Sequence, residues 1–395
     1  MKKIKLYNTL SKKVEEFESI EEGLVKIYSC GPTVYHYVHL GNLRTYVFAD
    51  TLRRTLSYAG YQVVSVMNIT DVGHLVSDGD SGLDKLEKGS AREGKTAFEV
   101  ADYYTEAFMK DLDLLNIPKD KFVFPRATEN IKEQIELIQK LEEKGYTYKI
   151  SDGIYFDTSK FDKYAELAKL DIEGLKSGAR VEENKEKKNI TDFALWKFSP
   201  QNERRQMQWD SPWGKGFPGW HIECSAMSQK YLGNHFDIHT GGIDLIPVHH
   251  TNEIAQSECA TGEKFVNYWC HTAFLNDKTG KMSKSNDDFL RLENLIGINH
   301  SPLAYKYFLL TAHYRSEVTF SYESMDSATN TFNKLINWCK ENKTNEGKIN
   351  EEYKIKFEEA VFNDINTSQA LAVMWNLIND KEISNEDKYQ TIIKF

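Results

Sequence analysis

Two short motifs in this chain combine residue types that can bind phosphate. The first, His39-Leu40-Gly41-Asn42, follows an apolar segment and opens an amphipathic one, so we expect it at a strand-to-helix turn. There His39 can donate a hydrogen bond to a phosphate oxygen, and Gly41 lets the backbone come close to a bound nucleotide. Asn42 stands where the helix N-terminus adds partial positive charge. His36 lies nearby in the sequence and could also face phosphate.

The second motif, Lys281-Met282-Ser283-Lys284-Ser285, follows a strand-like segment at 272–275 and a turn at 276–280. Its ammonium and hydroxyl groups suit a pyrophosphate leaving group, whose release is catalysed mostly by positioning and charge stabilisation. We expect Lys284 to contact phosphate directly and Lys281 to support it. Either motif alone would more often be a solvated loop or an ordinary histidine. The two in one chain predict a nucleotide site.

Four other side chains predict a metal site, namely Cys30, Cys224, His249 and Glu253. Cys30 ends a predicted strand, and Cys224 follows a turn into a helix. A spacing of four residues puts His249 and Glu253 on one face of a helix. Mixed sulfur, nitrogen and oxygen donors suit zinc. Their separations are not those of a zinc finger, so buried core cysteines remain an alternative, and His250 competes with His249 as a ligand.

The elements that must position the first motif follow from the hydrophobic pattern. Residues 24–30 predict a buried strand, 42–59 an amphipathic helix and 61–69 a second strand. Together they make a βαβ unit, the opening of a parallel sheet. The polar, glycine-containing stretch 78–94 predicts a surface loop, and Thr96 should cap the helix after it.

The central part of the chain changes character. Residues 129–144 predict a helix, and residues 146–150 with 154–156 predict a β-hairpin around Asp152-Gly153. A strand at 236–239 returns to the sheet pattern, and after Tyr314 the pattern becomes helical.

These elements predict an α/β protein with a Rossmann-like parallel-sheet catalytic domain, an inserted mixed α/β domain and a C-terminal helical bundle region. We expect residues 1–117 to form the first half of the catalytic domain and 118–218 the inserted connective domain. Residues 219–315 should complete the catalytic domain with the second motif, and 316–395 should be helical. Since no closing helix is obvious before Phe395, we expect the helical region to be truncated.

Composition is that of an ordinary soluble protein. Of 395 residues 40% are hydrophobic and 28% charged, and neither a signal peptide nor a run of apolar residues long enough to span a membrane is visible. The 5 cysteines are too few for a disulfide framework, so we expect a cytoplasmic protein. The net charge of −9 argues mildly against nucleic-acid binding, although local basic clusters exist.

The two phosphate motifs together resemble the HIGH and KMSKS elements of class I aminoacyl-tRNA synthetases. Asn42 stands where that class usually has a second histidine. Three further runs resemble the cysteinyl-tRNA synthetases specifically, and the resemblance covers residues 1 to about 320. These runs are Cys30-Gly31-Pro32-Thr33-Val34-Tyr35, Gly219-Trp220-His221-Ile222-Glu223-Cys224 and His249-His250-Thr251-Asn252-Glu253.

The resemblance implies ATP-dependent activation of L-cysteine to cysteinyl-adenylate and its transfer to tRNA(Cys). It implies one Zn2+ per chain that binds the substrate thiolate, Mg2+ with ATP, a monomer, no membrane partner, and a helical region that contacts tRNA but lacks an anticodon-binding tail. Site residues implied by the family are Thr70, Trp220 and His239 around the cysteine side chain, Gly31 and Thr33 at the amino acid and adenylate, and Asp244 at the ribose.

Two alternatives remain open on the sequence. A related ligase family transfers activated cysteine to an amino-sugar amine instead of tRNA, although Asp364-Ile365-Asn366-Thr367 resembles the helical domain of the synthetases. A zinc-stabilised binding protein or a metallohydrolase of the same fold would leave both phosphate motifs without a function.

Overall fold

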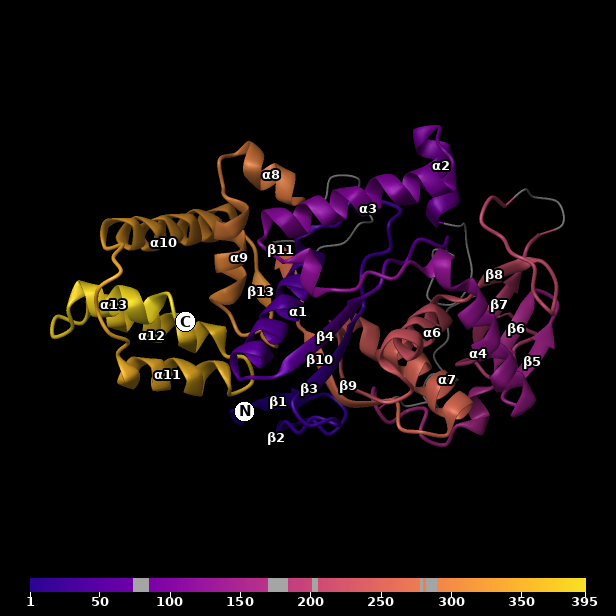
Figure 1. The fold of residues 1–395 in the computed structure, drawn as a ribbon. Helices are drawn as coiled ribbons and strands as arrows, with labels where there is room; N and C mark the ends of the chain where they lie inside the picture. The colour runs from indigo at the N-terminus through magenta and orange to yellow at the C-terminus, as the bar shows by residue number, and fades with distance from the viewer. Residues whose placement is uncertain (74–84, 170–183, 201–204, 278–279, 282–289) are drawn as a thin grey trace.

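The computed structural model describes residues 1–73, 85–169, 184–200, 205–277, 280–281 and 290–395. At its centre lies a parallel sheet of four strands in the order β10-β9-β3-β4 (Figure 1). These strands are β3 (Leu24–Ser29), β4 (Gln62–Met67), β9 (Phe236–Gly242) and β10 (Val266–Thr272). The expected Rossmann-like sheet is confirmed, with β9 pairing directly to β3 although a large part of the chain separates them.

Helix α1 (Leu40–Tyr58) crosses from β3 to β4 and so completes the predicted βαβ unit. It is held against the sheet by apolar side chains at helical spacing, of which Leu43, Val47 and Leu52 are buried. Helix α3 (Ala97–Leu114) begins as predicted at Thr96, whose side chain accepts a hydrogen bond from the Glu99 amide while Glu99 binds back.

One local prediction is wrong. Part of the stretch predicted as a surface loop is helix α2 (Lys85–Glu93), while residues 74–84 lie outside the described part of the chain. Leu86 is fully buried in the core, and the Gln206 side chain donates to Ser90 at 2.9 Å. Tertiary packing therefore stabilises a helix that its glycine and serine content disfavours.

The inserted region forms a second, antiparallel sheet in the order β5-β6-β7-β8 and lies on one side of the central sheet (Figure 1). The predicted helix and hairpin are both confirmed there. Apart from β9, the elements described between residues 118 and 261 are η1 (Lys119–Lys121), η2 (Ala127–Asn130), α4 (Ile131–Glu143), β5 (Thr147–Ile150), β6 (Gly153–Phe156), η3 (Thr158–Lys160), β7 (Phe193–Phe198), β8 (Gly216–Pro218), α6 (Trp220–Leu232), η4 (Ile243–Leu245), η5 (Ile246–His250) and α7 (Thr251–Thr261).

A third sheet carries the start of the second phosphate motif. Strand β11 (Leu275–Asp277) pairs antiparallel with β12 (Gly280–Lys281) and parallel with β13 (Val318–Thr319). The single strand expected at 272–275 is wrong, because these residues join the end of β10 to the start of β11. The backbone changes partners there, and the Ala273 amide donates to the Tyr314 carbonyl at 2.9 Å.

Helices dominate the remainder and lie on the opposite side from the insertion (Figure 1). They are α8 (Leu292–Gly297), α9 (Pro302–Leu310), α10 (Tyr322–Glu341), α11 (Glu351–Val361), α12 (Thr367–Asn379) and α13 (Asn385–Ile392). The expectation of no closing helix is wrong, since α13 precedes Phe395, whose ring stacks on Phe357 with centroids 4.2 Å apart.

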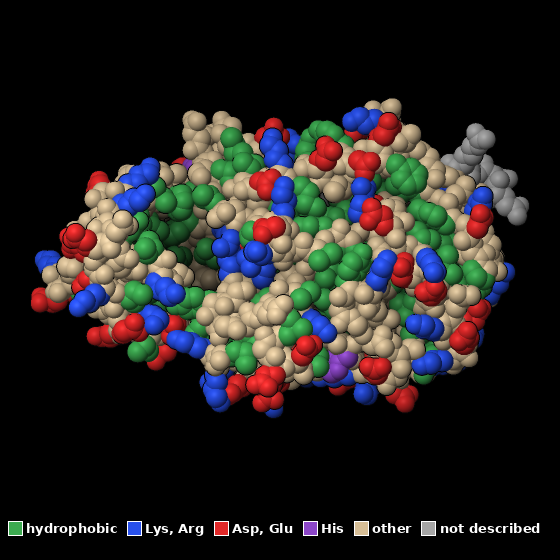
Figure 2. Space-filling view, in the orientation of Figure 1, with side chains coloured by type: hydrophobic (Ala, Val, Ile, Leu, Met, Phe, Trp, Pro, Cys, Tyr) green, Lys and Arg blue, Asp and Glu red, His purple; other side chains and the backbone are tan. Residues whose placement is uncertain are grey.

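The N-terminal segment is joined to the C-terminal helical region through backbone pairing. The N-terminal hairpin of β1 (Lys5–Asn8) and β2 (Lys13–Glu16) meets the α11–α12 connection, where the Asp364 amide donates to the Lys5 carbonyl at 2.9 Å. Figure 2 shows positive and negative side chains interspersed over one face, with a hollow beside the C-terminal helices. Among the described helices, none combines the length and apolar character needed to cross a bilayer.

Candidate active site

A cavity of about 330 Å³ opens beyond the carboxyl ends of β3, β9 and β10, where an open α/β sheet binds its ligands. It lies between the start of α1 and the connection from β10 to β11. The lining residues are Cys30, Gly31, Pro32, Thr33, Tyr35, His39, Gly41, Asn42, Thr45, Tyr46, Trp220, Gly242, Asp244, Leu245, Thr272, Ala273, Phe274 and Leu275. Seven site residues predicted from sequence outside the metal set are therefore brought together around one space: Gly31, Thr33, His39, Gly41, Asn42, Trp220 and Asp244.

His39 is the N-cap of α1. Its Nδ1 accepts a hydrogen bond from the Asn42 amide at 3.2 Å, which leaves the proton of a neutral imidazole on Nε2. The side-chain Oδ1 of Asn42 is buried and has no hydrogen-bond partner among the described residues. The imidazole thus lies at a helix N-terminus beside the cavity, where a donor and the helix dipole suit an anion, whereas the Asn42 oxygen is an acceptor and needs a donor.

The described segments on either side of the second motif lie near this helix N-terminus. The backbone of Lys281 in β12 pairs with Asn276, next to the cavity-lining Leu275, while Lys284 lies outside the described residues. On the far side of the motif, the Leu290 carbonyl accepts from the Leu40 amide at 2.9 Å. Both flanks of the segment 282–289 are therefore anchored close to the start of α1.

Gly31 has no room for a side chain. A Cβ there would lie 1.7 Å from the backbone oxygen of Asn68. Gly31→Ala should cost about 3 kcal/mol of unfolding free energy because the backbone must move. Urea unfolding followed by circular dichroism measures this. Gly297→Ala is the matched control, since a Cβ at Gly297 meets nothing within 4 Å, and an unchanged midpoint for Gly31→Ala would contradict the prediction.

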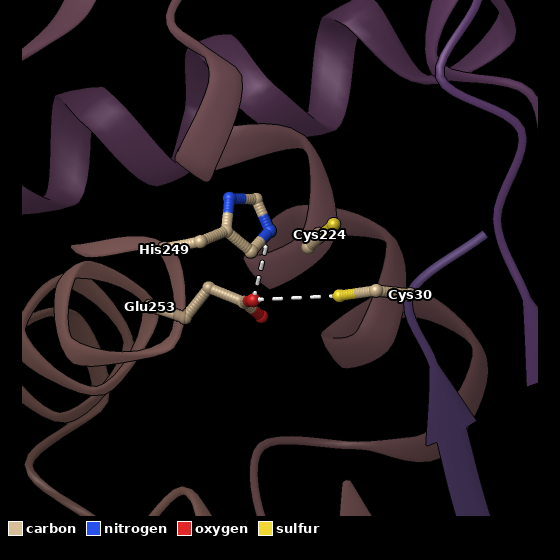
Figure 3. Close-up of side chains that lie close together, drawn as sticks. All are labelled: Cys30, Cys224, His249 and Glu253. Atoms are coloured by element: carbon tan, nitrogen blue, oxygen red, sulfur yellow. Dashed lines mark hydrogen bonds and ion pairs between the residues drawn. The ribbon is translucent and has the colours of Figure 1, made fainter. Parts of the chain in front are cut away.

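Beside the cavity, four buried side chains converge from three parts of the chain (Figure 3). Cys30 follows β3, Cys224 lies in α6, and His249 and Glu253 lie on consecutive turns of η5 and α7. One donor atom from each lies within 4.8 Å of every other, and full ligation at about 2.0–2.3 Å needs only small shifts of these atoms. The Nε2 of His249 is 3.1 Å from Oε1 of Glu253, as the spacing of four predicted.

The four donors differ in how far their surroundings favour the deprotonated form. A hydrogen bond from Cys30 lowers the pKa of Cys224 to about 7. Burial opposes ionisation of Glu253, but His239 and His249 lower its pKa to about 2. Burial likewise opposes a charged His249, but Cys224 and Glu253 raise its pKa to about 10. Burial and the neighbouring Cys224 raise the pKa of Cys30 well above its usual range. Among the protein groups alone, Glu253 is therefore the clearly anionic donor, and a bound cation would have to favour the thiolates and the neutral His249.

A second donor set overlaps the first. Cys30 and Glu253 also converge with His239 and His250, again with all donor atoms within 4.8 Å. The Nε2 of His250 lies 3.4 Å from the Cys30 sulfur, and its Nδ1 lies 2.7 Å from Nε2 of His271. Geometry alone thus leaves both His249 and His250 as candidate ligands.

Three residues expected near the substrates are not among the described residues that line the cavity. His239 is fully buried beneath the cavity, with its Nε2 3.0 Å from Glu253 and its ring stacked on Trp269. Thr70 is buried and accepts a hydrogen bond from Asn68 at 3.0 Å. The ring of His36 stacks on Tyr104, with centroids 5.5 Å apart. Their roles at the substrates stay predictions.

The sequence did not predict how many histidines meet at the two donor sets. His221 lies with its Nδ1 3.0 Å from Nδ1 of His249, and His271 contacts His250, so the cluster contains 5 of the chain's 11 histidines. Glu223 is buried beside it, and burial together with Asp71 raises its pKa well above the usual range. The positions of His239 and His271 could have indicated the cluster, because both residues lie near the ends of neighbouring parallel strands.

Comparison with known proteins identifies the family. Residues 16–330 match the model of the tRNA synthetases class I (C) catalytic domain. The cysteine–tRNA ligase 1 of Burkholderia lata is 53% identical over 94% of this chain and 79% of its own length. The cysteine–tRNA ligase of Treponema denticola is 48% identical over 97% of this chain and 83% of its own. This chain belongs to the cysteine–tRNA ligases.

The fold comparison agrees at a coarser level. A Mycobacterium tuberculosis methionyl-tRNA synthetase, solved in complex with methionyl-adenylate, superposes with a TM-score of 0.63 over 93% of this chain and 87% of its own. At 16% identity that likeness concerns the fold alone. The related cysteine–tRNA ligases are named for a tRNA acceptor, so the alternative of an amino-sugar acceptor gains no support.

Proposed function

We propose that this cysteine–tRNA ligase forms cysteinyl-adenylate in the cavity beyond β3, β9 and β10, beside a zinc site of Cys30, Cys224, His249 and Glu253. The observation that carries this proposal is that the buried donor set adjoins the cavity lined by the His39–Asn42 turn. Cys30 belongs to both, because it is a donor and lines the cavity.

Among the two donor sets, we assign the metal to the one with both thiols. Two sulfur donors match the preference of zinc better than a set with one sulfur and two imidazoles in a site this buried. His221 beside Nδ1 of His249 supplies the outer partner that a ligating imidazole usually has. In this assignment His239 and His250 are not ligands. His239 would orient Glu253, and His250 would orient Cys30.

The residues suit selection of cysteine against serine. A shape-fitting pocket discriminates poorly between a thiol and a hydroxyl of nearly equal size. When bound, zinc would supply a Lewis acid that favours the thiolate of the substrate as an additional ligand. Trp220 lines the cavity, and the centroid of its ring lies 4.5 Å from that of His249. Its ring can therefore pack on the substrate side chain and hold it next to the donor set.

The remaining cavity residues suit the nucleotide. His39 would donate from Nε2 to the α-phosphate, and Asn42 would add its amide at the helix N-terminus. Asp244 would accept from the ribose; its carboxylate lies over Gly242, where a Cβ would be 2.4 Å from Oδ1. Lys284 and Lys281 would bind the departing pyrophosphate, with Mg2+ accompanying ATP.

The region 316–395 is proposed to contact tRNA(Cys), and the division at 117, 218 and 315 is kept as the proposed domain arrangement. We propose a monomer located in the cytoplasm. These assignments rest on the family and on the placement of the C-terminal helices opposite the inserted sheet (Figure 1).

Cysteine-dependent exchange of labelled pyrophosphate into ATP tests the proposal. We expect exchange with cysteine and, with serine, a kcat/KM lower by on the order of 10⁴-fold. Adding tRNA(Cys) should convert the adenylate to cysteinyl-tRNA, measured on acid gels. Equal exchange with both amino acids would contradict selection at a metal, and no exchange by folded, zinc-replete protein would overturn the assigned site.

A further inference from the structure

Arg44 is a buried cation whose acceptors, among the described residues, are backbone carbonyls. It lies on the first turns of α1, just after the His39–Asn42 turn, and its side chain is almost fully buried. Its Nη1 donates to the carbonyls of Ala273 at 2.9 Å and Phe274 at 2.6 Å, and its Nη2 to those of His313 at 3.2 Å, Tyr314 at 3.4 Å and Ser316 at 2.5 Å.

These carbonyls belong to two segments that lead into the sheet containing β12, where the second phosphate motif begins. Ala273 and Phe274 line the cavity and lead directly into β11. The turn at 313–316 leads into β13, which pairs with β11, and β11 pairs with β12, where the second motif begins at Lys281. One guanidinium thus joins α1, which begins at the first motif, to the segment that leads into β11 and to the turn that leads into its neighbour β13.

The turn at 313–316 is also held from its outer side. The Asp364 carboxylate accepts from the Tyr314 hydroxyl at 2.6 Å and from Arg315 Nε at 2.8 Å. Asp364 lies in the α11–α12 connection, where it and Ile365 adopt left-handed φ values of 61° and 53°. A β-branched residue pays for that conformation with strain, so surrounding contacts must fix this connection.

We propose that Arg44 is a positioning residue for adenylate formation, which holds the 313–316 turn against Asp364 and thereby fixes the His39–Asn42 turn relative to β11 and to β12, where the second motif begins. The inference rests on the proposed roles of those motifs. Arginine is required because its planar fork offers five donors in two directions, whereas a lysine offers three from one point. We therefore expect a lysine at this place to hold one of the two segments and release the other.

Arg44→Lys should lower kcat of cysteine-dependent pyrophosphate exchange by roughly 10- to 100-fold, because a misplacement near 1 Å costs about that much. The KM values for ATP and cysteine should stay within about twofold, since the loss falls on the transition state. The matched control is Arg53→Lys, which alters another buried arginine of α1 that pairs with Asp50 at 2.8 Å. It should lower the melting temperature comparably and leave kcat unchanged.

Folded Arg44→Lys with wild-type kcat, or with the same kinetic change as Arg53→Lys, would overturn the inference. If Arg44→Lys does not fold, Asp364→Asn decides: a several-fold lower kcat at unchanged KM supports the inference and an unchanged kcat overturns it. Lys284→Ala in the same assay tests the motif itself. Full activity of that variant would refute the proposed site, whereas its inactivity beside an active Arg44→Lys would refute only the role of Arg44.

Discussion

Cys224→Ser is expected to reduce bound zinc from one atom per chain to a small fraction and cysteine-dependent exchange by 10²-fold or more. A serine hydroxyl stays protonated near neutral pH, so it cannot replace the thiolate that binds the metal. Even changes to residues that merely support a ligand cost about 10- to 100-fold in metal affinity, and loss of a ligand should cost more. Zinc is measured by atomic emission on purified protein, and exchange in the same preparation.

The same substitution separates the two donor sets. Cys224 belongs only to the set with His249, and His250 only to the other. Retained zinc in Cys224→Ser together with lost zinc in His250→Ala would transfer the site to the second set. Cys259→Ser is the control, because this buried cysteine of α7 belongs to neither set and should leave both zinc and exchange unchanged.

Lys284→Ala should lower kcat of pyrophosphate exchange by about 10³-fold while binding of cysteine changes little. A cation directed at developing negative charge acts mainly in the transition state, where loss of one such group costs about 10²–10³-fold. Lys281→Ala should have a smaller effect, consistent with a supporting role. Steady-state exchange at varied ATP and cysteine gives kcat and both KM values.

Lys334→Ala serves as the control for loss of one positive charge, since Lys334 lies exposed on α10. If Lys284→Ala kept wild-type exchange, the second motif would have no part in pyrophosphate release. A metallohydrolase or a binding protein with this fold predicts that result, because neither would use the motif.

The reaction was predictable from short contiguous motifs. The His39–Asn42 turn carries its own helix cap, and the βαβ unit around it follows from local hydrophobic periodicity. The spacing of His249 and Glu253 likewise fixes their approach within one helical stretch. Such features are local, so the sequence states them without knowledge of the fold.

The long-range arrangement was not predictable in the same way. Nothing near Arg44 in the sequence reveals that its acceptors are carbonyls of residues 273–274 and 313–316. Helix α2 forms where local composition predicts a loop, because Leu86 is buried in the core. Burial and pairing between distant segments leave little trace in a local pattern.

Local sequence patterns thus predicted the parallel sheet and the residues that form the first donor set. Only the tertiary structure brought His239, His250 and His271 to the same point, since β9 and β10 become neighbours through pairing between segments separated by other elements. It also placed the N-terminal hairpin against Asp364. Contacts made across such distances are decided by how the whole core packs.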